Sequence, residues 1–72
     1  MNKDGELIRM ANDIAKNLAV YPEPEAVAGV VRHITEFWPL RMRSRLHTII
    51  EGGGNGLSPL ALAAGHRLFE KH

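Results

Sequence analysis

The sequence predicts an all-α fold, a small compact bundle of about four short helices in a single domain over residues 1–72. Three observations lead to this prediction. Apolar residues recur at three- and four-residue steps in four separate segments, and no segment alternates with the two-residue period of a strand. Proline or glycine separates each segment from the next. A chain this short fits one domain at most, and a core of this size seldom yields more than about 3–5 kcal/mol of net stability, so a partner could supply further burial.

The first helix is predicted from about Gly5 to Ala19. Its expected inner face consists of Leu7, Met10, Ala11, Ile14 and Leu18. The apolar stripe is wider than a small core requires, because it also includes Ile8, Ala15 and Ala19. This surplus suggests a partner surface, although alanines on the flank of a helix are also good helix formers.

The second helix is predicted from about Glu23 to Phe37, after a proline-containing break at residues 21–25. Its expected inner face consists of Val27, Val30, Val31, Ile34 and either Phe37 or Trp38. Gly29 beside Ala26 leaves room for a close helix crossing.

The third helix is predicted to begin at Pro39, which suits a first helical position, and to end near Glu51. Its expected inner face consists of Met42, Leu46, Ile49 and Ile50. Glycines in the segment 52–56 can adopt the left-handed conformations that stop a helix and reverse the chain.

The fourth helix is predicted from about Pro59 to Glu70, with Ser58 as its N-cap. Ala61 and Gly65 form a small-residue step that permits close contact with a neighbouring helix.

No catalytic, cofactor or metal site is predicted in this chain. The glycine cluster lacks the preceding strand and the lysine of a phosphate-binding loop, and neither Ser44 nor Ser58 lies in a nucleophile motif. The carboxylates fall on caps and exposed faces, and cysteine is absent, which fits a reducing compartment. The histidines are dispersed without ligand spacing and are expected to be structural or surface residues: His33, His47, His66 and His72.

The middle of the chain is basic, although the net charge of the whole is only +1. Residues 32–50 contain four arginines against the single acid Glu36. One interpretation is a small nucleic-acid-binding module that uses Arg41, Arg43 and Arg45 on the third helix. A pI near 8.3 is low for that class, and the alternatives are a solvated face or arginines paired with carboxylates of a partner.

Several motifs in order resemble one protein family. They are residues 8–15 (IRMANDIA), 26–34 (AVAGVVRHI), Phe37-Trp38, Arg41-Met42-Arg43 and 52–60 (GGGNGLSPL). Together they are similar to the delta subunit of NAD-dependent formate dehydrogenase. The chain departs from the Asp-Pro-Arg-Met-Arg typical of that family, because Pro39-Leu40 precede Arg41, and the acid expected to cap the third helix is missing.

The resemblance implies a non-catalytic accessory subunit that supports the assembly, stability or activity of a larger enzyme. The larger subunits would carry the molybdenum or tungsten pterin, the iron-sulfur clusters, FMN and the NAD site, and this chain would hold no cofactor. The expected partner is the large catalytic subunit, with no membrane and no nucleic acid. No apolar run long enough for a signal or a membrane span occurs, so a cytoplasmic location is expected.

Docking is expected through helix faces, namely the apolar sides of the first and fourth helices and the corner from Trp38 to Arg43, with arginines paired to carboxylates. The candidate interface residues are Arg9, Met10, Asn12, His33, Phe37, Trp38, Arg41, Met42, Arg43 and Leu57.

Overall fold

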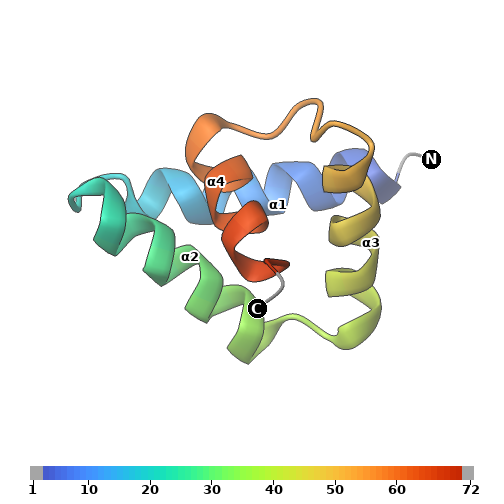
Figure 1. Cartoon of the computed structure of the whole chain (residues 1–72), viewed down its shortest axis with the longest axis horizontal. Coiled ribbons are helices and arrows are strands. Elements are labelled where there is room, and N and C mark those ends of the chain that lie inside the picture. The colour runs from blue at the N-terminus through green and yellow to red at the C-terminus, as the bar shows by residue number, and fades with distance from the viewer. Residues whose placement is uncertain (1–2, 71–72) are drawn as a thin grey trace.

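The computed structural model describes residues 3–70 and confirms the predicted all-α bundle (Figure 1). Its four helices are α1 (Lys3–Leu18), α2 (Glu23–Phe37), α3 (Leu40–Glu51) and α4 (Pro59–Leu68). No strand occurs within residues 3–70. The two residues at each end of the predicted domain, His72 among them, lie outside the described residues.

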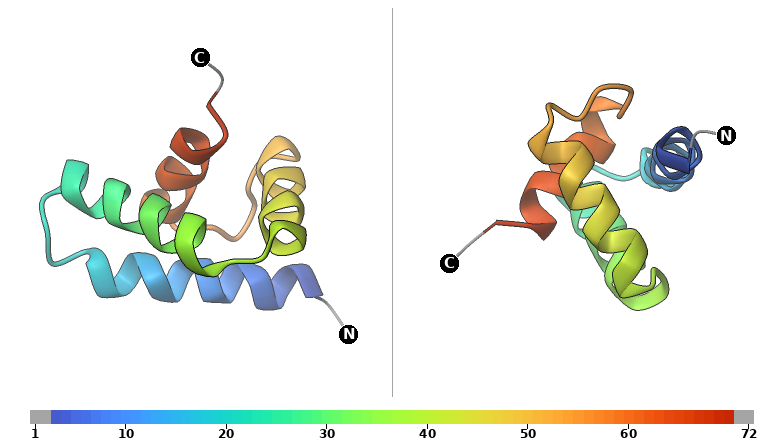
Figure 2. Two further views of the ribbon diagram at one scale, coloured as in Figure 1. Left: turned by 90° about the horizontal axis from the view of Figure 1, so that it is seen from below. Right: turned by 90° about the vertical axis from the view of Figure 1, so that its right-hand side faces the viewer.

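The helices are arranged around α1 and α4, each of which packs against all three other helices. The most extensive packing is between α2 and α4, whereas α2 and α3 touch only weakly. Figure 2 shows α1 and α2 side by side as a hairpin, with α4 and α3 standing across them. The core therefore lies where α1 and α4 join the two remaining helices.

The helices begin and end close to the positions predicted from proline, glycine and capping residues, with small shifts. α2 has the predicted bounds, but α3 begins one residue late, because Pro39 has an extended backbone (ψ 156°) and serves as the N-cap. No side chain caps α3, as expected from the missing acid. α4 ends at Leu68 rather than at residue 70, because the backbone of Phe69 leaves the helical conformation (φ −103°, ψ 10°) and Phe69 serves as the C-cap. α1 spans Lys3–Leu18 instead of the predicted 5–19.

The glycine segment after α3 is a helix-stop loop, as predicted. The N–H of Gly53 donates to the carbonyl of Ile50 at 3.0 Å, and that of Gly54 donates to Ile49 at 2.9 Å. This pair of bonds is a Schellman motif, which requires a left-handed residue after the helix, and Gly53 supplies it with φ 113°. Ser58 then caps α4 by accepting a hydrogen bond from the N–H of Ala61 at 3.2 Å, also as predicted.

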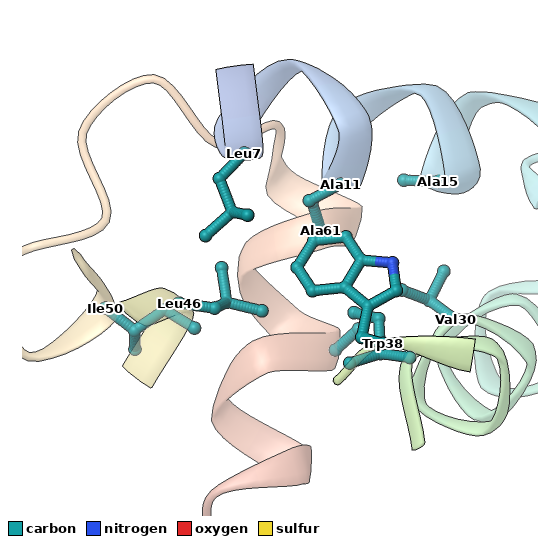
Figure 3. Close-up of a cluster of buried hydrophobic side chains, with 10 residues drawn as sticks. Leu7, Ala11, Ala15, Val30, Trp38, Leu46, Ile50 and Ala61 are labelled. Carbon is teal, nitrogen blue, oxygen red and sulfur yellow. The ribbon is translucent and has the colours of Figure 1, made fainter. Parts of the chain in front are cut away.

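The apolar pattern of the sequence identified some of the core residues but not all of them. In α1 the buried line is Leu7, Ala11 and Ala15, whereas Met10, predicted to face inward, is 39% exposed. The inner face is rotated because α1 packs against three helices at once, and the small alanines allow that close approach. Figure 3 shows the cluster, which contains Leu7, Ala11, Ala15, Val30, Ile34, Trp38, Leu46, Ile50, Ala61 and Ala64.

Two small-residue crossings have the predicted packing role. A Cβ built on Gly29 of α2 would lie 3.0 Å from a methyl carbon of Leu18, so glycine brings α2 close to α1. A Cβ built on Gly65 of α4 would overlap the side chain of Ile50 on α3. Both glycines are therefore explained by close contact between helices. The gain from this packing outweighs the helix-propensity cost of each glycine, which is roughly 1 kcal/mol.

Candidate partner-binding surface

The ten candidate interface residues divide into an exposed group and an internal group. Five lie on the surface: Arg9, Met10, His33, Phe37 and Arg41. The others are partly or wholly buried: Asn12, Trp38, Met42, Arg43 and Leu57. The structure therefore does not assemble the ten residues into one face.

Trp38 belongs to the core rather than to an exposed docking corner. It is only 5% exposed, and its ring points into the cluster of Figure 3, whereas its neighbour Phe37 is 68% exposed. Docking through Trp38, as part of the corner from Trp38 to Arg43, is therefore not supported by its position in this fold. Met42 and Leu57 also pack against the core, which leaves little of either for a partner.

Asn12 is used inside the molecule. Its Nδ2 donates to the carbonyl of Gly56 at 2.9 Å, and its Oδ1 accepts from the N–H of Ser58 at 2.8 Å. Both halves of the amide thus tie α1 to the end of the glycine loop. Because Ser58 is the N-cap of α4, Asn12 also positions the start of that helix.

The three arginines of α3 do not form one basic surface. Residues two apart on a helix point roughly 200° apart, so Arg43 faces away from Arg41 and Arg45. Arg43 is half-buried, and its Nε is enclosed without a hydrogen-bond partner. Arg45 pairs with Asp4 at 3.4 Å. The nucleic-acid interpretation is therefore not supported, since it required all three arginines to act together.

A groove between α1 and α2 brings two exposed candidates, His33 and Phe37, together. It has a volume of about 300 Å³ and a mostly apolar lining. The residues that line it, here called the α1–α2 groove, are Ile14, Asn17, Leu18, Gly29, Arg32, His33, Glu36 and Phe37. The rings of His33 and Phe37 lie 4.9 Å apart at one end, and Arg32 pairs with Glu36 at 3.5 Å along the rim. Met10 lies one helical turn before Ile14 and so shares its side of α1.

Comparison with protein families identifies the chain. Residues 6–64 match the family model described as NADH-dependent formate dehydrogenase delta subunit FdsD. The chain belongs to this delta-subunit family. No match was found among curated proteins or among solved structures. The resemblance noted in the sequence is thereby confirmed, and membership of a formate dehydrogenase subunit family implies a complex with other subunits.

The delta-subunit match covers most of the surface described above. It begins in the first turns of α1 and ends within α4, so the α1–α2 groove, all of α3 and the glycine loop lie inside it. Within residues 3–70 no three His, Cys, Asp or Glu side chains are close enough together to hold a metal ion. No helix in that range is both long and apolar enough to cross a membrane.

Sequence reasoning missed several exposed residues of this delta-subunit chain. Leu40 is 69% exposed at the start of α3, and Val20 and Tyr21 are 82% and 51% exposed in the turn before α2. The helical period contained the signal for Leu40, because it lies off the stripe formed by Leu46 and Ile50. For Val20 and Tyr21 the signal was their place in a turn, where no helix face buries them.

Proposed function

We propose that this chain is a non-catalytic accessory subunit of NAD-dependent formate dehydrogenase that docks on the large catalytic subunit and supports its assembly, stability or activity. The observation that carries this proposal is the delta-subunit family match over residues 6–64. In this proposal the redox chemistry and its cofactors, namely the molybdenum or tungsten pterin, the iron-sulfur clusters, FMN and NAD, belong to the larger subunits.

The α1–α2 groove supports docking through helix faces. Exposed aromatic and methionine side chains are typical of protein interfaces. Phe37 lines the groove, and Met10, which is not a lining residue, is exposed one helical turn before Ile14 on the same side of α1. Burial of an exposed phenyl ring stabilises a complex by about 1.5–3 kcal/mol. Removal of the Phe37 ring has little effect on the isolated chain, because most of the ring is already in water.

The test is co-purification with the enzyme. A tagged chain expressed in its native cell should retrieve the large formate dehydrogenase subunit, identified by mass spectrometry, and deletion of the chain should lower the yield or activity of the complex. Phe37→Ser should reduce retrieval, while Tyr21→Ser, an exposed aromatic at the opposite end of α2, serves as the matched control. Failure of the unaltered chain to retrieve any formate dehydrogenase subunit would count against the proposed function itself.

A further inference from the structure

The outward side of α3 forms a second surface, separate from the α1–α2 groove. At about 100° per residue, six exposed positions of α3 fall within an arc of about 140°. These positions, here called the α3 outward face, are Leu40, Arg41, Ser44, Arg45, Thr48 and Glu51. The small side chains of Ser44 and Thr48 leave a hollow of about 450 Å³, which Asp4 of α1 closes on one side.

The α3 outward face is basic over its first two turns, where Arg41 and Arg45 lie, whereas Glu51 lies at its far end beside His47. Cations from two elements converge there, since Arg41 and Arg45 also line an adjoining hollow of about 170 Å³ together with Lys3 of α1. Asp4 is the only acid among the residues that line either hollow, and it is paired with Arg45 at 3.4 Å. Arg41 lines both hollows and makes no ion pair within residues 3–70. Its guanidinium is therefore available to an external anion.

Arg41 also lies where a cation is unfavourable for the isolated chain. It is in the first turn of α3, whose unpaired N–H groups create a partial positive charge. That turn contains no acidic residue, and no side chain caps it. An external carboxylate beside Arg41 would be attracted by the guanidinium and by the end of the helix at once. The two features thus favour the same ligand chemistry.

We propose that the α3 outward face binds a carboxylate-bearing segment of the catalytic subunit, with Arg41 as the main anchor. This inference rests on the proposed function and specifies the chemistry of a contact within it. The planar guanidinium of Arg41 pairs with a partner carboxylate in the two-pronged geometry that arginine favours. Leu40, 69% exposed and one residue away, provides an apolar contact for the same segment.

The negative charge of Asp4 favours a protein segment over a nucleic acid as the ligand of this surface. A double-stranded nucleic acid carries one negative charge per about 1.7 Å of its axis, so phosphates near Arg41 would be accompanied by others near Asp4. The carboxylate of Asp4 would repel them, and it already neutralises Arg45. A protein segment can place one acid at Arg41 and a neutral or basic group opposite Asp4. The mixed charge of this surface therefore fits a peptide and not a polyphosphate.

The experiment measures the affinity of the full chain for formate dehydrogenase complex purified from cells that lack it. Arg41→Glu should weaken binding about tenfold or more, since it replaces an attractive charge pair with a repulsive one. Arg67→Glu, a reversal of an exposed arginine on α4, is the matched control and should bind nearly as well as the unaltered chain. The melting temperature of Arg41→Glu should be equal or higher, because an acid in the first turn of a helix is favourable, and this separates lost binding from lost folding.

Each outcome is informative. Equal affinities of the Arg41→Glu and Arg67→Glu chains would overturn the proposal, and so would tight, Arg41-dependent binding of a DNA or RNA duplex in a salt titration. No binding by the unaltered chain would instead refute the proposed function. Loss of binding confined to Arg41→Glu, with a retained melting temperature and weaker binding of the unaltered chain at high salt, is the expected result.

Discussion

Replacement of Asn12 by alanine should destabilise the chain through the loss of two long-range hydrogen bonds. The side-chain amide of Asn12 donates a hydrogen bond of 2.9 Å to the carbonyl of Gly56, which is 44 positions further along the chain. It accepts a hydrogen bond of 2.8 Å from the N–H of Ser58, which is 46 positions further along. A hydrogen bond of this kind contributes about 0.5–1.5 kcal/mol net, so the two together contribute about 1–3 kcal/mol. The core of a chain this short seldom provides more than about 3–5 kcal/mol of net stability, so this loss would be a large fraction of the total.

The matched control is Asp13→Ala. Asp13 is the exposed neighbour on α1, and asparagine and aspartate gain a similar amount of helix propensity when changed to alanine, so the difference between the two variants isolates the hydrogen bonds. Urea unfolding can be followed by the fluorescence of Trp38, the only tryptophan, which is 5% exposed when folded. A free energy of unfolding for Asn12→Ala within about 0.5 kcal/mol of that for Asp13→Ala would refute the structural role of the amide.

Two further predictions concern helix packing and capping, and both use the same urea assay. Gly65→Ala should lower the free energy of unfolding by about 1–2 kcal/mol, because its Cβ overlaps the side chain of Ile50 and overpacking outweighs the gain in helix propensity. Ile50→Val alone is destabilising but should partly rescue Gly65→Ala, and strictly additive effects of the two changes would contradict the overlap. The double change Pro39→Asp with Leu40→Pro places an N-cap carboxylate and a first-turn proline at the uncapped start of α3, and it should raise the free energy of unfolding by about 1 kcal/mol. Pro39→Ala with Leu40→Pro lacks the capping carboxylate, and equal stability of these two double variants would argue against a capping role.

Local signals in the sequence predicted the fold well because they act over a few residues. Proline at 22 and 24 predicted the start of α2, and Ser58-Pro59 predicted both the N-cap and the first residue of α4. The glycines after α3 predicted a helix-stop loop, which the left-handed backbone of Gly53 confirms. Each of these features depends on allowed backbone angles and orphan amide groups near one position, so no knowledge of the distant chain is required.

The candidate surface was less predictable because it depends on contacts between distant segments. Phe37 and Trp38 are adjacent and both apolar, and the direction of the extended backbone after α2 places the indole inside and the phenyl ring outside. Asn12 is predicted from the sequence as an interface residue, whereas its two hydrogen bonds, to the carbonyl of Gly56 and from the N–H of Ser58, depend on segments that are distant in the sequence. The same limit applied to the arginines, for which the sequence showed a basic stretch but not the burial of Arg43 or the pairing of Arg45 with Asp4.

The placement of α4 has a consequence for synthesis of the chain on the ribosome. α2 packs most extensively against α4, and Asn12 of α1 is hydrogen-bonded to the start of α4, yet α4 leaves the exit tunnel after α1, α2 and α3. Until then the apolar sides of α1 and α2 have no complete core to enter, and the nascent chain presents them to solvent or to whatever protein is nearby. Between the emergence of α2 and that of α4, the apolar sides of α1 and α2 are therefore exposed, and during this time the chain is most open to contact with other proteins.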